Sequence, residues 1–159
     1  MSSIAGDAIE RRFLLLRVGP RLCTVSLESV IETLRPLPIE GLADAPRFIE
    51  GLSVVRGEPV PVVNLAALLG DATIRPARRF VMVRAGHGRR IALAVEDVVS
   101  VVRLDEAMFR ERPPLLQEAL PGCVERLGAL DGKLVATLAT MRILPEEAWG
   151  GMALAGGGR

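Results

Sequence analysis

The chain has 159 residues with a formal net charge of +1; half of the residues are hydrophobic and only 3% are aromatic. A chain of this length fits one globular unit, and its hydrophobic content argues against intrinsic disorder. Because 20 basic residues are dispersed along the sequence and balanced by 19 acidic ones, we expect no nucleic acid among the partners.

The sequence predicts a cytoplasmic protein. Residues 1–12 carry Asp7 and Glu10 and lack the apolar core of a signal peptide, and we expect this segment to be flexible. Apolar stretches elsewhere are broken well short of a membrane span. Direct membrane insertion is therefore not expected, and any membrane association would come through a partner.

Two cysteines, Cys23 and Cys123, are too few for a metal site. Cys23 lies inside an apolar run, so we expect both to be buried or semi-buried thiols in a reducing compartment. A disulfide between them is the less favoured alternative.

The sequence contains a weak internal duplication. Phe13 to Gly19 reads F-L-L-L-R-V-G and resembles Phe80 to Gly86, which reads F-V-M-V-R-A-G. After each segment comes a second apolar run, then an acidic residue (Glu28 or Glu96), then another β-rich run. The order of predicted elements therefore repeats.

Two further segments predict β-hairpins. Asp131-Gly132 lies between apolar runs and suits a type I′ turn, which needs positive φ at both central residues. Arg56-Gly57 is a weaker version of the same signal. Pro59 and Pro61 follow it and remove ladder donors, which favours an edge strand.

A short helix is expected after this strand, with Asn64 as N-cap, residues 65–69 as body and Gly70 as terminator. Residues 138–144 would be its counterpart in the second unit. Residues 105–120 predict a connection with a turn or two of helix.

About five short strands per unit and little helix predict two small β-barrels that share one hydrophobic core. We expect the first barrel at about 13–75 plus returning C-terminal elements, and the second at about 76–144, within a domain of residues 13–147. The Gly-rich tail at 148–159 is expected to be flexible, unless Trp149 tethers its first part by packing.

No pattern in the sequence points to catalysis. His87, the only histidine, lies between two glycines and predicts an exposed turn, and no Gly-x-Ser-x-Gly elbow, metal-ligand spacing or nucleotide-binding loop occurs. We therefore expect no catalytic residue, metal or cofactor, and a protein that is not an enzyme. Chemistry at His87 remains the alternative.

Residues 45–65 resemble the signature of CheW-like domains. They read A-P-R-F-I-E-G-L-S-V-V-R-G-E-P-V-P-V-V-N-L, which gives a Pro, a Phe-Ile-x-Gly step and an Arg-Gly-x-x-x-Pro run. Two hydrophobic residues and Asn64-Leu65 follow, where the family commonly has Asp-Leu. Weaker similarity extends over about residues 13–144.

The resemblance implies a mainly β fold of two SH3-like five-stranded barrels that share a hydrophobic core, with a few short helices. It also implies an adaptor, or scaffold, in bacterial chemosensory signalling. Such a protein couples the cytoplasmic tips of methyl-accepting chemotaxis receptors to the regulatory domain of a CheA-type histidine kinase, and joins membrane-associated receptor arrays through these partners. A CheW-like scaffold in a pathway for biofilm, development or gene expression is the alternative.

Five residues are expected to bind partners: Val30, Glu32, Leu34, Arg56 and Gly57. The resemblance places the first three on a partner-facing strand and the last two in a signature turn. Strand alternation independently predicts that Val30, Glu32 and Leu34 share one face, which suits a modest interface.

Two alternatives remain open at these positions. Glu32 could simply be solvated, and the Arg56 guanidinium could bind strand carbonyls and hold the barrels together. For three other residues, Gly51, Asp131 and Gly132, we expect structural roles in a close backbone approach or a turn.

Overall fold

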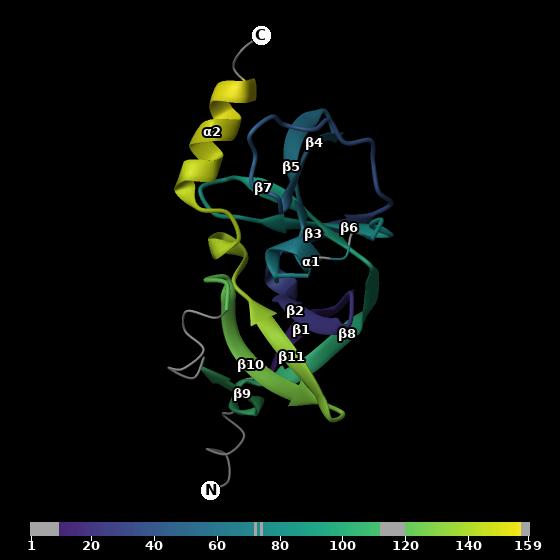
Figure 1. Cartoon of the computed structure of the whole chain (residues 1–159). Helices are drawn as coiled ribbons and strands as arrows, with labels where there is room; N and C mark the ends of the chain where they lie inside the picture. Colours follow the sequence, from purple (N-terminus) through teal and green to yellow (C-terminus); the bar gives the residue numbers. More distant parts are fainter. Residues whose placement is uncertain (1–9, 72, 74, 112–119, 157–159) are drawn as a thin grey trace, which may run out of the picture.

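The computed structural model describes residues 10–71, 73, 75–111 and 120–156 (Figure 1). Their strands are β1 (Glu10–Val18), β2 (Arg21–Ser26), β3 (Val30–Leu34), β4 (Ile49–Val55), β5 (Glu58–Asn64), β6 (Arg79–Arg84), β7 (Arg90–Val95), β8 (Asp97–Asp105), β9 (Phe109–Glu111), β10 (Val124–Leu130) and β11 (Lys133–Leu138). The helices are α1 (Leu65–Leu68), α2 (Glu146–Gly156) and three single 3-10 turns, η2 (Leu27–Ser29), η3 (Glu106–Met108) and η5 (Thr140–Arg142).

The strands form two sheets, which we call sheet A and sheet B. Sheet A has the order β8-β1-β2-β11-β10-β9, and sheet B has the order β3-β6-β7-β5-β4. Most neighbouring strands are antiparallel, but β11 pairs with β2 in parallel and β5 pairs with β7 in parallel. Each sheet therefore combines strands from the two sequence units, and the predicted two-subdomain β fold is confirmed.

Three clusters of buried side chains explain how the sheets are held. The largest lies between the two sheets and contains residues from both, among them Leu16, Val25, Leu65, Val83 and Leu93. A second cluster lies within sheet B around Phe80 and Met82, and a third lies within sheet A around Leu15, Leu22 and Val135. Figure 1 shows α1 between the two sheets, where Leu65 is fully buried.

The hairpin turns and α1 follow their local sequence. Arg56 and Gly57 have φ of 53° and 81°, and Asp131 and Gly132 have φ of 52° and 77°. These are the positive φ values that a type I′ turn needs. The Asn64 side chain accepts a hydrogen bond from the backbone N–H of Ala67 at 3.0 Å, so it caps α1 as predicted.

The expectation of an edge strand at Pro59 and Pro61 is wrong, because β5 lies between β4 and β7. The parallel ladder to β7 begins only at Val62, so both prolines precede it and pair with β4 alone. An internal strand thus tolerates two prolines where it has a neighbour on one side only.

The C-terminal segment forms α2 through residue 156, where the composition predicts a flexible tail. Met152 is 9% exposed and belongs to the large cluster, and Ala148 and Trp149 pack against it. The Arg89 guanidinium lies 4.5 Å from the centroid of the Trp149 ring and pairs with Glu146 at 2.6 Å. The structure therefore shows the alternative, in which packing of Trp149 holds the first part of the C-terminal tail against the core.

Residues 10–12, which were expected to belong to a flexible N-terminal segment, begin β1. The expectations for residues 1–9, 112–119 and 157–159 fall outside the described residues. Within residues 105–120, η3 supplies one helical turn and β9 a short sixth strand of sheet A. Among the described residues, no helix is long and apolar enough to cross a membrane.

Candidate functional site

The structure brings together two of the residues predicted to bind partners. Glu32 lies on β3 and Arg56 lies in the β4–β5 turn, so they come from strands at the two edges of sheet B. The Arg56 guanidinium donates from Nε to Glu32 Oε2 at 2.9 Å and from Nη2 to Oε1 at 2.7 Å. This bidentate pair joins the two edges of the sheet.

The ion pair is at the surface, because the side chain of Arg56 is 71% exposed and that of Glu32 is 26% exposed. The hydrogen bonds from Arg56 lower the pKa of the Glu32 carboxyl below its ordinary value. Among the described residues, the guanidinium contacts this carboxylate and no strand carbonyl. This contact therefore does not match the alternative in which the Arg56 guanidinium binds strand carbonyls and holds the two barrels together.

A β-bulge changes how β3 presents its side chains. The pairing with β6 shifts between Val30, opposite Val83, and Glu32, opposite Met82. The extra residue turns Glu32 and Leu34 to the other side of the strand from Val30. Val30 therefore packs toward the core between the sheets, Leu34 packs toward the sheet B core, and the three do not share one face as alternation predicted.

Further residues surround the Glu32–Arg56 pair. Glu58, which begins β5, binds Arg90 of β7 in a second ion pair, and Val54 of β4 is 66% exposed opposite Pro59. We call the set Glu32, Val54, Arg56, Gly57, Glu58, Pro59 and Arg90 the β4–β5 turn patch. An exposed aliphatic side chain and two ion pairs in one patch combine an apolar contact with charge complementarity.

Sequence reasoning missed Val54, Glu58 and Arg90. Strand alternation predicts that one of the neighbours Val54 and Val55 points outward. The structure shows that it is Val54, because Val55 is only 3% exposed. No local signal could have linked Arg90 to Glu58, because they lie 32 residues apart in the sequence.

Arg84 supports the beginning of β3. Its guanidinium donates to the backbone carbonyl of Glu28 at 2.8 Å and lies 3.5 Å from that of Val30. These bonds fix η2 and the first residue of β3 against β6. Arg84 is therefore a positioning residue for the strand that carries Glu32.

The glycine at 51 lies where two backbones approach closely. Gly51 has φ of 145°, and a Cβ there would collide with the carbonyl oxygen of Glu40, which bonds to the N–H of Leu52 at 2.8 Å. The β4–β5 pairing also shifts between Ile49 and Gly51. Asp131 and Gly132 lie in the exposed β10–β11 turn.

The sequence counterpart of β3 in the second unit is β8, an edge strand of sheet A. Two of its valines are exposed, Val99 at 41% and Val101 at 52%. Neighbouring aliphatic side chains that are exposed in an isolated protein can mark a surface that a partner covers in a complex, although single exposed ones are common. β8 is therefore a second candidate contact surface.

The remaining candidates for chemistry lie apart from these surfaces. His87 occupies the exposed β6–β7 turn with φ of 55°. Cys23 and Cys123 are buried and form no disulfide, and burial raises the pKa of Cys23 to about 12. Among the described residues, no group of three or more His, Cys, Asp or Glu is placed to hold a metal ion.

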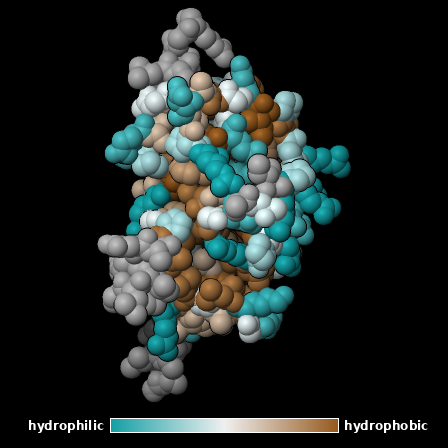
Figure 2. Space-filling view, viewed as in Figure 1, coloured by the Kyte–Doolittle hydropathy of each residue, from teal (hydrophilic) through white to brown (hydrophobic). Residues whose placement is uncertain are grey.

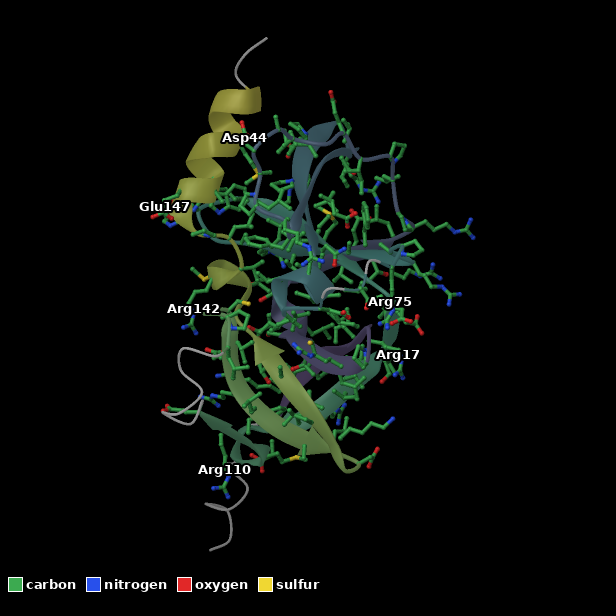
Figure 3. All side chains as sticks on the ribbon, in the orientation of Figure 1. Arg17, Asp44, Arg75, Arg110, Arg142 and Glu147 are labelled. Atoms are coloured by element: carbon green, nitrogen blue, oxygen red, sulfur yellow. The ribbon has the colours of Figure 1, made fainter. Side chains whose placement is uncertain are left out.

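Charged side chains are spread over both sheets. Figure 3 shows Arg17, Arg110 and Arg142 well separated from one another, and Arg142 lies 3.6 Å from Glu125. These three arginines therefore do not form one basic cluster.

Comparisons with known proteins agree with this architecture. Residues 12–148 match the family model of the CheW-like domain. The solved structure of the scaffolding protein TtCheW from Thermoanaerobacter tengcongensis superposes with a TM-score of 0.73 at 22% identity, covering 82% of this chain and 90% of that one.

Curated relatives match over most of their length. The chemotaxis protein CheW of Klebsiella aerogenes is 22% identical over 148 residues, covering 92% of this chain and 89% of the relative. Protein FrzA of Myxococcus xanthus is 36% identical over 126 residues, covering 75% of this chain and 77% of the relative. The chain therefore belongs to the CheW-like family of adaptor proteins in chemotaxis signalling.

Proposed function

We propose that this protein bridges two partners, the regulatory domain of a CheA-type histidine kinase and the cytoplasmic tip of a chemoreceptor. The β4–β5 turn patch contacts the kinase domain, and the exposed face of β8 contacts the receptor helices. The bidentate Glu32–Arg56 pair at the end of sheet B is the observation that carries this proposal.

Two features support the assignment of the patch to the kinase domain. The patch lies at the end of a β subdomain, where β3 and β4 are the edge strands of sheet B among the described residues and Glu40 bridges β4 only at Leu52. Such an end can accept another β-domain. It also offers an exposed aliphatic side chain, Val54, in the same turn region as the two ion pairs. A contact here would be small, about 600 to 800 Å² on each partner.

The assignment of β8 to the receptor rests on its exposed valines. A helical receptor tip presents aliphatic side chains at helical spacing, and the exposed Val99 and Val101 on the edge strand β8 are aliphatic side chains that such a helix can cover. With the two surfaces on different sheets, both partners can bind at once. Recruitment from the cytoplasm to receptor arrays would follow from this bridge.

The pathway could also be a chemosensory one outside chemotaxis. This alternative is kept because the relative at 36% identity is named only Protein FrzA, whereas the 22% identical relative of Klebsiella aerogenes is named a chemotaxis protein. A deletion strain distinguishes the two: loss of directed swimming supports chemotaxis, and intact swimming with a changed biofilm or developmental phenotype supports the alternative.

A charge-reversal series tests the patch. The affinity for the cognate kinase regulatory domain is measured by calorimetry for the wild type, Glu32→Arg, Arg56→Glu and the double variant. We expect about a tenfold loss for each single variant, because each places like charges together, and partial recovery in the double variant, which restores the pair in reverse. Single variants with wild-type affinity and an intact circular dichroism spectrum would exclude the patch as the contact.

A further inference from the structure

A cavity of about 510 Å³ opens at one end of sheet A, away from the β4–β5 turn patch. It lies where the β1–β2 turn and the β10–β11 hairpin meet the end of α1. Its apolar walls come from β2, β10, β11, the end of α1 and the segment before β10. They include Leu69, Leu120, Val124, Leu127, Leu134 and Ala136. A volume of this size is typical of a binding pocket.

The charged residues that line the cavity are all basic: Arg17, Arg21 and Lys133. Asp97 lies opposite Arg17 in the β1–β8 ladder, but among the described residues no ion pair joins a carboxylate to Arg17 or Lys133. Neither Arg17 nor Lys133 is thus held in an ion pair within the described part of the molecule. An anionic group on an occupant would supply a counter-charge.

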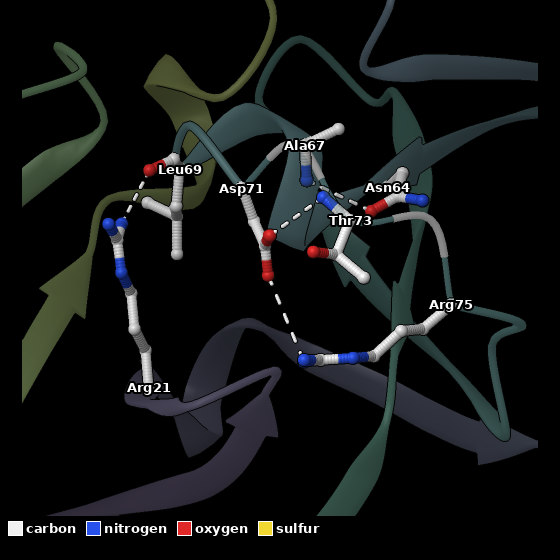
Figure 4. A network of polar contacts seen from close by, with 7 residues as sticks. All are labelled: Arg21, Asn64, Ala67, Leu69, Asp71, Thr73 and Arg75. Carbon is white, nitrogen blue, oxygen red and sulfur yellow. Dashed lines mark hydrogen bonds and ion pairs between the residues drawn. The ribbon is translucent and has the colours of Figure 1, made fainter.

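The third cation is fixed in place. The Arg21 guanidinium donates to the carbonyl of Leu69 at the end of α1 (Figure 4). Asp71 lies near enough to interact with Arg21, but it accepts a hydrogen bond from the N–H of Thr73 at 2.9 Å and lies 3.8 Å from Arg75. The Asp71 carboxylate is thus also engaged with Thr73 and Arg75, and all the charged side chains that line the cavity are basic.

The exposed surface around the cavity favours a peptide segment over a small molecule as the occupant. Leu134, on the cavity wall, is 69% exposed, and Figure 2 shows hydrophobic side chains at the surface over the β10–β11 hairpin. A small carboxylate could fill the cavity and leave Leu134 in water. A peptide segment could fill it and also cover Leu134, which would add buried apolar area.

We propose that this cavity is a third docking site, which takes an acidic segment of a partner protein. The segment inserts an aliphatic or aromatic side chain between the β10–β11 hairpin and the end of α1. Its carboxylates lie against Arg17, Arg21 and Lys133. The site is in a different subdomain from the β4–β5 turn patch, so the adaptor can hold this segment while its kinase surface is occupied.

The test uses the isotope-labelled full chain, titrated with a synthetic peptide built of Glu-Leu-Leu-Glu repeats and followed by NMR. We expect shifts at the cavity residues, and an affinity about tenfold lower in Leu134→Glu, because one leucine contact is replaced by a repelling carboxylate. Met141→Glu is the matched control, because Met141 is 67% exposed and does not line the cavity. It should bind the peptide like the wild type.

Three further measurements can overturn the proposal. No shifts at millimolar peptide would refute the site, and equal binding of a peptide with Lys in place of Glu would refute the charge requirement. Decanoate that binds the cavity with the same affinity in wild type and Leu134→Glu, where the acidic peptide does not bind, would identify a small-molecule site instead. Kinase-domain affinity should be unchanged in Leu134→Glu, so failure here is distinguishable from failure of the turn patch.

Discussion

The bidentate hydrogen bonds between Arg56 and Glu32 predict a lowered pKa of the Glu32 carboxyl, which can be measured. Because Arg56 stabilises the charged carboxylate, the pKa of Glu32 lies below its ordinary value in the folded protein. The contribution of the pair to stability is then present above the ordinary glutamate pKa and is lost as the pH falls through the lowered one.

An NMR titration of the side-chain carboxyl measures this shift. We expect the Glu32 midpoint below 4.5 in the wild type and a rise toward 4.5 in Arg56→Ala. Arg103→Ala, which removes an exposed arginine on β8, should leave the midpoint unchanged. A wild-type midpoint at or above 4.5 would mean that the ion pair does not form in solution.

The same residue pair separates a structural role of Arg56 from a partner-binding one. Exposed ion pairs contribute little to stability, so Arg56→Ala should move the Tm by no more than about 2 °C while it weakens kinase-domain binding. A large drop in Tm with unchanged affinity would favour the structural role.

Two glycines with positive φ differ in the space around them and form a matched pair. Gly51→Ala should destabilise the protein by about 3 kcal/mol, because the new methyl group meets the Glu40 carbonyl in addition to the backbone strain. Gly57→Ala has open space and should lose only about 1 kcal/mol through strain. Equal losses in urea denaturation would show that the close approach at Gly51 is absent.

At the scale of elements, α2 is where the structure and the composition of the chain differ most. Gly150 and Gly151 lower helix propensity, and propensity alone favours a frayed tail. Burial of Met152 and the contacts of Trp149 with Arg89 and the core stabilise the helix through tertiary packing.

Truncation of a buried side chain tests this packing. Met152→Ala should lower the free energy of unfolding by about 2 kcal/mol, whereas Glu147→Ala, at an exposed position of the same helix, should change it by less than about 0.5 kcal/mol. If both substitutions are neutral in chemical denaturation, α2 is not packed against the core.

The elements that the sequence predicts well are those whose cause is local. The Arg56-Gly57 turn and the Asn64 cap depend on neighbours within a few residues, and both form as expected. The β3 bulge and the Glu58–Arg90 pair depend on which strands meet, and that is decided by packing of the whole sheet. Alternation therefore misplaced Val30 relative to Glu32.

At the scale of the molecule, the shared core makes the two sheets one unit. Leu16 of sheet A is fully buried in the cluster that also contains Val83 and Leu93 of sheet B. Repetition in the sequence indicated two barrels around one core. It did not indicate the parallel β11–β2 and β5–β7 pairs, which place strands from both sequence units in each sheet.

This arrangement predicts cooperative unfolding. Leu16→Ala should cost about 3 kcal/mol and should raise amide hydrogen exchange in both sheets to a similar extent. Val101→Ala, at an exposed position of β8, is the control and should leave exchange in both sheets near wild type. Faster exchange confined to sheet A in Leu16→Ala would show that the subdomains unfold separately.

The central claim is that one chain holds two proteins at once through surfaces on different sheets. Light scattering after gel filtration of a mixture of this protein, a receptor tip fragment and the kinase regulatory domain measures this most directly. We expect a single peak with the mass of all three components in the wild type, and loss of the kinase domain alone from that peak in Glu32→Arg. Binary complexes that exclude each other, with no ternary mass at any concentration, would contradict the account.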